Sequence, residues 1–248
     1  MKRTTFIKPT LLAMSISLGF YTGLAKAETI LVPNGDFEQI SGTNNIVTKT
    51  NANCITGWVF SGTINNYGAL YKDSANSLPE QGNFVAFINT DSPGDNPTQL
   101  TSAESLATIA ANTTYTLTVS IGNPTGTSDT SWANPANLTI GLLADDVEIG
   151  TPTAIPIGTI PENSDGTHSQ FQDFTFSFTT GDSFEVDSLI GQSLKIQITS
   201  VYAQGRQSHF DNIFLEAVAI PEPSTWALLL GGIGLLTMTI VWQRRQVN

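Results

Sequence analysis

Histidine and cysteine, which carry much of the nucleophilic and metal-dependent chemistry of proteins, are scarce in this chain. Its 248 residues include two histidines and one cysteine. A single cysteine cannot form an internal disulfide, so the fold must depend on its core. A catalytic thiol needs a base beside it, and His168 and His209 are both remote from Cys54 in the sequence. We therefore interpret Cys54 as a small core residue.

Positive charge is also scarce away from the two ends of the chain. Residues 28–219 contain four Lys and Arg but 20 Asp and Glu, a formal charge of −16. Such a surface repels nucleic acid and anionic lipid, so we expect no nucleic-acid partner.

Recognisable catalytic motifs are missing. The sequence has no Gly-x-Ser-x-Gly elbow, no His-Glu-x-x-His motif and no P-loop. Asp145, Asp146 and Glu148 are close in sequence, but their setting is typical of a solvated turn. We therefore expect that the protein is not an enzyme. A glycan hydrolase that uses two carboxylates is the less favoured alternative.

What the chain does contain is a sorting segment at each end. At the N-terminus, three basic residues precede a mostly apolar stretch over residues 11–24, and small residues follow at Ala25 and Ala27. This pattern predicts a secretory signal peptide over residues 1–27, cleaved after Ala27. An uncleaved membrane anchor is the alternative.

The C-terminal segment, residues 220–248, combines a proline pair, an apolar run and a basic end. The run over residues 226–242 is just long enough to cross a bilayer as a helix. The preceding prolines block upstream extension of that helix, and the basic pair after it favours a cytoplasmic C-terminus.

This tail resembles the PEP-CTERM sorting signal of exported bacterial proteins. The residues that match the signal are Pro221, Glu222, Pro223, Arg244 and Arg245. The resemblance implies recognition by an exosortase-type membrane protease and a link to extracellular polysaccharide. We therefore expect export, anchoring in the inner membrane by a transmembrane helix, and transfer to the cell surface or extracellular matrix. A permanent anchor is the alternative.

The body between the two ends, residues 28–219, shows the two-residue periodicity of β-strands. Apolar and polar residues alternate over residues 115–121, 174–179 and 194–199. Turn residues separate these segments, which predicts a single all-β sandwich domain. Residues 101–109 combine a capping box with helical spacing, but the stretch is too short to stand alone as a helix, so we predict a strand there.

Five short motifs follow one another along this body. They occupy residues 34–38 (NGDFE), 57–58 (GW), 105–117, 171–176 (FQDFTF) and 210–215 (FDNIFL). Their order resembles the galactose-binding-like jelly rolls, especially carbohydrate-binding modules. The resemblance implies a jelly-roll β-sandwich that binds or organises extracellular polysaccharide. A structural or adhesive surface protein without sugar binding is the alternative.

The same resemblance implies a structural calcium ion where the first and last strands meet. Its candidate carboxylate ligands are Glu38 and Asp211. Asp211 shares the strand parity of Ile213 and Leu215, so we expect it to point toward the core, where an ionised carboxylate is costly unless paired or bound to metal. The alternative is that Asp211 accepts hydrogen bonds from local amides.

Sugar binding would require exposed aromatic rings beside polar side chains. Trp132 lies in a polar loop without core periodicity, and we predict it as the main sugar contact. Further candidates are Tyr67, Tyr71 and Tyr202. The alternative for each is packing beneath a loop. We expect Trp58, by contrast, in the core.

Overall fold

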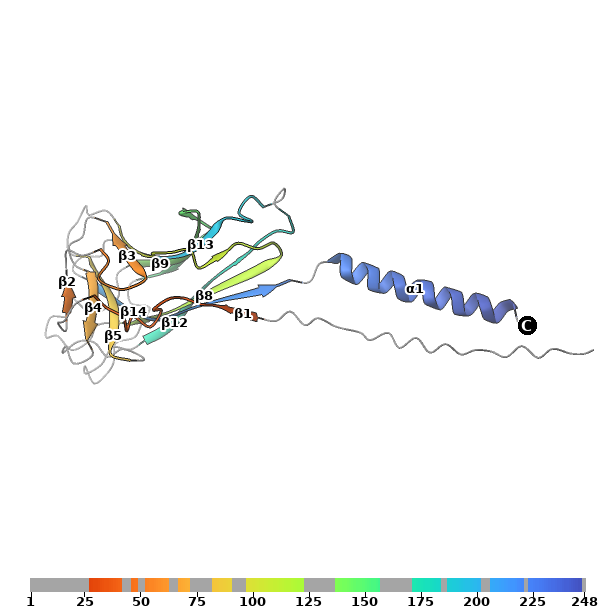
Figure 1. Ribbon diagram of the computed structural model, residues 1–248, viewed down its shortest axis with the longest axis horizontal. Coiled ribbons are helices and arrows are strands. Elements are labelled where there is room, and N and C mark those ends of the chain that lie inside the picture. The colour runs from red at the N-terminus through yellow and green to blue at the C-terminus, as the bar shows by residue number, and fades with distance from the viewer. Residues whose placement is uncertain are drawn as a thin grey trace, which may run out of the picture.

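The computed structural model describes residues 27–41, 46–48, 52–62, 67–71, 82–90, 97–122, 137–156, 171–183, 187–201, 206–220 and 223–246. Within these residues, fourteen strands form two antiparallel sheets that pack face to face (Figure 1). The prediction of an all-β sandwich is confirmed.

The first sheet contains the two longest strands of the described chain, β8 and β14. Its order is β12 (Phe171–Thr179), β8 (Thr113–Gly122), β14 (Arg206–Ala219), β5 (Phe84–Thr90), β4 (Tyr67–Tyr71) and β2 (Ile46–Thr48), and β1 (Ala27–Ile30) pairs with the far end of β14. The second sheet has the order β10 (Val147–Glu148), β9 (Asn137–Ala144), β13 (Ser193–Val201), β6 (Thr98–Ser102) and β3 (Trp58–Ser61), with β11 (Thr153–Ile155) on β9 and β7 (Ala107–Thr108) on β13.

The core lies between the sheets and follows from the alternation seen in the sequence. Leu117, Val119 and Ile121 of β8 face Ile196 and Ile198 of the other sheet across a continuous apolar cluster. Each such side chain contributes about 1.5–3 kcal/mol when it is fully buried. The interior is therefore sufficient to hold the two sheets together.

The two residues expected in the core from sequence are found there. The Trp58 ring packs on Phe37 at a centroid distance of 5.4 Å, and its Nε1 donates a hydrogen bond to the carbonyl of Asn34. Cys54 is buried as a free thiol, and burial raises its pKa to about 11. At neutral pH the thiol is therefore protonated and a poor nucleophile.

The ambiguous segment over residues 101–109 is not helical. Strand β6 ends at Ser102, and β7 occupies Ala107–Thr108. The Ser102 hydroxyl donates to the carbonyl of Glu104 and accepts from the backbone N–H of Ile196 on β13. Because pairing with the neighbouring sheet strand uses these groups, the local helical signals are overridden.

A β-bulge in β14 changes the direction of one key side chain. Asp211 pairs with Ser120 of β8, but the next pair is Phe214 with Thr118, so β14 carries one extra residue there. Asn212, inside the bulge, has a φ of 49°. Bulges of this kind re-aim side chains.

The parity argument that pointed Asp211 toward the core is therefore wrong. Its partner Ser120 lies on the side of β8 opposite the inward-facing Val119 and Ile121. Asp211 thus shares the outward face of the first sheet, whereas Ile213, within the bulge, packs into the core.

The C-terminal segment forms one helix, α1 (Pro223–Gln246), which extends from the end of β14 away from the sandwich (Figure 1). Its side chains between residues 230 and 240 are exposed. No helix within the described part of the chain is long and apolar enough to cross a membrane. The predicted helix is present, but its membrane-spanning role is not confirmed.

Several of the predicted sorting residues fall outside the described ranges. The signal peptide does so up to residue 26, and β1 begins at Ala27. Pro221 and Glu222 also lie outside, whereas Pro223 is the first residue of α1, and Arg244 and Arg245 belong to its last turn.

Candidate active site

A row of three polar side chains crosses the outward face of the first sheet. Ser120 on β8 is paired with Asp173 on β12 and with Asp211 on β14. Neighbouring strands are about 4.8 Å apart, so the two aspartates are separated by about 10 Å at their Cα atoms. The sheet register therefore brings together residues that are remote in sequence.

Burial changes sharply along this row. Asp173 is exposed, whereas Ser120 and Asp211 are 0% exposed. Ser120 Oγ donates a hydrogen bond to Asp173 Oδ1 at 2.5 Å, and Asp211 Oδ1 accepts one from the backbone N–H of Asn212 at 2.7 Å. Among the described residues, Asp211 is the one buried carboxylate. Such a group is costly to bury, which makes it a candidate for chemistry.

A second row, two residues further along the strands, supplies apolar and aromatic surface. The register places Phe171, Gly122, His209 and Phe87 side by side on β12, β8, β14 and β5. Phe171 lies over Gly122, where an added Cβ would come within 2.7 Å of its ring. Val85 and Phe87 form a small buried cluster against which Phe171 packs.

His209 contributes a polar ring to this second row but no charge. It is fully buried, and this burial lowers its pKa to about 3. The imidazole is therefore neutral at physiological pH, because desolvation disfavours the cation. A neutral ring can donate or accept a hydrogen bond but does not bring a positive charge next to Asp211.

The opposite end of the same face is exposed and rich in hydroxyl groups. Thr114 and Thr116 of β8 share hydrogen bonds with Thr179 and Ser177 of β12, at 2.9 and 3.2 Å. The Phe214 side chain, directed outward by the bulge, is 39% exposed. One continuous face therefore joins an exposed polar end to a buried end that contains a carboxylate.

The predicted calcium ligands have separate roles. Both carboxylate oxygens of Glu38 accept hydrogen bonds at the start of β5: Oε1 from the backbone N–H groups of Asn83 and Phe84, and Oε2 from the side chain of Asn83. No group of three or more His, Cys, Asp or Glu side chains within the described residues is arranged to hold a metal. A calcium ion at Glu38 and Asp211 stays a prediction, which melting curves with and without a chelator would check.

Only one of the four predicted sugar-contact side chains, that of Tyr67, lies within the described residues. Trp132 and Tyr202 lie outside the described residues, as does the side chain of Tyr71 at the end of β4. Tyr67 is 9% exposed and stacks on Phe60 with ring centroids 4.5 Å apart. This arrangement corresponds to the packing alternative rather than to an exposed platform.

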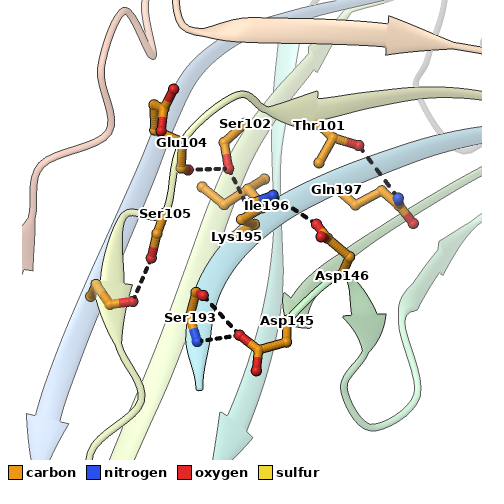
Figure 2. Close-up of polar contacts among 11 residues, drawn as sticks. Thr101, Ser102, Glu104, Ser105, Asp145, Asp146, Ser193, Lys195, Ile196 and Gln197 are labelled. Atoms are coloured by element: carbon orange, nitrogen blue, oxygen red, sulfur yellow. Dashed lines mark hydrogen bonds and ion pairs between the residues drawn. The ribbon is translucent and has the colours of Figure 1, made fainter. Parts of the chain in front are cut away.

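The acidic hairpin between β9 and β10 is a solvated turn, as its sequence suggested. Asp145 and Asp146 have φ angles of 44° and 69°, which are turn conformations. Figure 2 shows their contacts: Asp145 accepts from the N–H and hydroxyl of Ser193, and Asp146 forms an ion pair with Lys195 at 2.7 Å. Both carboxylates are therefore occupied in fastening the hairpin to β13.

Sequence reasoning missed Ser120, Asp173 and His209 as site residues. Ser120 lies on the polar side of the alternating pattern in β8, and Asp173 is paired with it on β12. That pattern shows that these side chains face outward, but not which strands are neighbours. The row of Ser120, Asp173 and Asp211 can be recognised only when the strand order of the sheet is known.

A family model described as HpiC1 cyclase matches residues 28–216, and a PEP-CTERM protein-sorting motif matches residues 219–245. The second match confirms the resemblance of the tail. No curated protein matches the chain significantly.

Solved structures of cyclases share this fold. A cyclase from Fischerella sp. TAU is 25% identical with a TM-score of 0.60, covering 79% of this chain and all of that one. A cyclase from the same source, in complex with 4-(1H-indol-3-yl)butan-2-one, is 24% identical with a TM-score of 0.59, covering 78% of this chain and all of that one.

Carbohydrate-binding modules are also among the structural neighbours. The xylan-binding domain CBM22-1 from Paenibacillus barcinonensis Xyn10C is 11% identical, with a TM-score of 0.40, and the match covers 80% of this chain and 99% of that one. We draw no inference about ligands from a similarity at this level.

The expectation that the protein is not an enzyme is wrong. It rested on scarce histidine and missing local motifs, but the family match extends over most of the sandwich and points to cyclases. Strand register assembles the surroundings of a buried carboxylate from distant parts of the chain, so no local motif marks such a site. The same fold can carry different functions, because function depends on the site. The chain therefore belongs to the HpiC1-like cyclase family and carries a PEP-CTERM protein-sorting motif behind its β-sandwich.

Proposed function

We propose that the sandwich is a cyclase that closes a ring in an apolar, unsaturated substrate at the outward face of the first sheet. The observation that carries this proposal is the full burial of Asp211 next to a row that contains Phe87 and Phe171. A buried carboxyl group can transfer protons, and the apolar neighbours would hold a substrate that water solvates poorly.

Ring closure by proton transfer needs a proton donor and a proton acceptor, and a single carboxyl group can act as both. In its protonated form, Asp211 donates its proton to an unsaturated carbon of the substrate. A second π bond in the same molecule then attacks the cation and forms the new ring bond. A proton leaves the cyclised cation to the Asp211 carboxylate, which restores the acid, so substrate and product are isomers.

The surroundings of Asp211 suit a cationic intermediate. The faces of aromatic rings attract cations, and Phe87 and Phe171 supply such rings in the neighbouring row. His209 stays neutral, so it adds no positive charge that would oppose the cation. The two carboxylates of the row have different environments, because Asp173 is exposed and accepts a hydrogen bond from Ser120 whereas Asp211 is buried. This difference favours a single proton-transfer group over two equivalent ones.

Deuterium exchange tests this chemistry without knowledge of the natural substrate. The full-length chain is incubated in D₂O with 4-(1H-indol-3-yl)butan-2-one, whose indole carbons exchange by protonation. Incorporation is followed by mass spectrometry on the indole-containing fragment, because the protons next to the ketone exchange separately by enolisation. We expect exchange above the buffer rate for the native chain and for Asp146→Asn, and the buffer rate for Asp211→Asn. Absence of exchange with the native chain, or equal exchange with Asp211→Asn, would refute the proposal.

Polysaccharide binding is the second candidate function. It is favoured by the exposed end of the same face, where Phe214 lies beside the hydroxyl-bearing side chains of β8 and β12. Sugars stack on exposed aromatic rings and accept hydrogen bonds from hydroxyl groups. A glycan array that shows binding by the native chain and its loss in Phe214→Ala would support this function, and an array without any binding would contradict it.

For the tail, we propose that an exosortase-type protease processes it after export and anchoring in the inner membrane. The matched sorting motif and the helix α1 behind the sandwich support this sequence of events. Replacement of Pro221, Glu222 and Pro223 by alanine should leave the full-length chain in the inner membrane. Normal release to the cell surface would contradict the proposed sorting role.

A further inference from the structure

Strand β14 changes its neighbour on one side at the place where Asp211 lies. Strand β5 pairs with residues 206–210, and β1 pairs with residues 215–218. Residues 211–214, which include the bulge, therefore lie in the gap between β5 and β1. Backbone groups in such a gap need partners from elsewhere, because buried unpaired peptide groups are costly.

A short segment of the N-terminal loop fills this gap. We call residues 33–38 the clasp. The backbone N–H of Ile213, within the bulge, donates to the carbonyl of Gly35 at 2.8 Å. The contact is too close for any side chain, because a Cβ on Gly35 would lie 2.6 Å from the carbonyl oxygen of Ile213. Only glycine permits this approach.

The other end of the clasp is fastened to β5. Glu38 accepts hydrogen bonds from the backbone N–H groups of Asn83 at 2.5 Å and Phe84 at 2.9 Å. At its start, the Asn34 side chain donates to the carbonyls of Gln39 and Thr56. The clasp is therefore held at both ends and bridges β5 to the bulge of β14.

We propose that the clasp fixes the bulge that directs Asp211 to the outward face, and that Gly35 and Glu38 are positioning residues for its carboxyl group. The backbone part of this inference stands on contacts alone, and the catalytic part rests on the proposed cyclase function. Without the clasp, the extra residue of the bulge is free to shift along β14. A shift of one residue would turn Asp211 toward the core.

The test compares Gly35→Ala with Gly141→Ala in the full-length chain. Gly141 lies in β9 of the other sheet, where an added Cβ would meet the Pro152 side chain at 3.3 Å, so the control perturbs packing away from the clasp. We expect amide hydrogen exchange over residues 211–214 to accelerate at least tenfold in Gly35→Ala and to stay unchanged in Gly141→Ala. We also expect the saturating rate of deuterium transfer to 4-(1H-indol-3-yl)butan-2-one to fall at least tenfold while the probe's dissociation constant changes less than twofold.

Glu38 provides a second test in case Gly35→Ala does not fold. Glu38→Gln keeps an oxygen that can accept from both backbone N–H groups, whereas Glu38→Ala removes it, so we expect near-native exchange over residues 211–214 in the first and accelerated exchange in the second. Native-like exchange in Gly35→Ala or Glu38→Ala would overturn the proposal. If exchange accelerates but the native chain transfers no deuterium to the probe, the clasp is supported and the proposed cyclase function fails.

Discussion

Two pairs of aspartates in this molecule differ in how the fold brings their members together. Asp145 and Asp146 are neighbours in sequence and lie at an exposed hairpin. Asp173 and Asp211 are remote in sequence but lie on either side of Ser120 in one row of the first sheet. The adjacent pair, Asp145 and Asp146, is easily seen in the sequence but has a structural role. The candidate catalytic residue belongs to the other pair, which strand register brings together.

The environments of the two pairs explain this difference. Hydrogen bonds from the backbone N–H and the hydroxyl of Ser193 lower the pKa of Asp145, so its charge is stabilised in the turn. Asp146 has its charge balanced by Lys195. Asp211 is fully buried, and the adjacent row of the sheet contains Phe87 and Phe171. A carboxylate that already serves the fold is a poor proton-transfer group, whereas a buried one is a candidate.

The largest expected difference between the pairs is in catalysis. Asp211→Asn should reduce proton transfer to the indole probe by about 10²–10⁴-fold, the usual range for loss of a general acid–base group. Asp145→Asn and Asp146→Asn should leave the rate within twofold of the native chain. Rates measured by mass spectrometry in D₂O check this, and similar losses in all three variants would remove the distinction between the pairs.

The next effect concerns pH and the buried neighbour of Asp211. His209 has a pKa of about 3 when folded and an ordinary value of 6.5, so below pH 6.5 the unfolded chain binds a proton that the folded chain does not. Stability is therefore lost as the pH falls, by about 2 kcal/mol between pH 7 and pH 5.

Denaturant unfolding at the two pH values measures this loss, and His209→Gln should flatten it. The hairpin behaves differently, because the lowered pKa of Asp145 contributes stability that is lost only as the pH falls below the ordinary value of 3.8. An equally steep loss between pH 7 and pH 5 in His209→Gln would mean that another group is responsible.

A smaller effect is expected at the residue between the aspartates of the first sheet. Ser120→Ala removes the short hydrogen bond to Asp173 Oδ1, and we expect a loss of about 0.5–3 kcal/mol in the free energy of unfolding. Asp173→Asn should cost less, because Asp173 is exposed and its amide can still accept from the serine. Chemical denaturation of both variants checks the order, and a larger loss in Asp173→Asn would contradict it.

The contrast between the two aspartate pairs also shows which features of the fold and the candidate site could be predicted from the sequence. The alternation in residues 115–121 predicts β8 correctly, and the NGDFE, GW and FDNIFL motifs mark the places where Gly35, Trp58 and the bulge of β14 meet. The direction of Asp211 could not be predicted, because the bulge depends on a contact between Gly35 and Ile213, which are far apart in the chain. Ser120 and Asp173 were missed for a related reason, since their pairing requires the strand order of the sheet.

The smallest expected effect belongs to the hairpin. The Asp146–Lys195 ion pair has its carboxylate side chain 70% exposed, so solvent screens most of the attraction. A double-mutant cycle with Asp146→Asn and Lys195→Met should give a coupling energy of about 0.2–1 kcal/mol that decreases with added salt. The cycle is measured by chemical denaturation at low and high ionic strength. A coupling energy well above this range, or one that salt does not weaken, would show that the Asp146–Lys195 pair is shielded from solvent. The hairpin and Asp211 would then differ in strand register but not in burial.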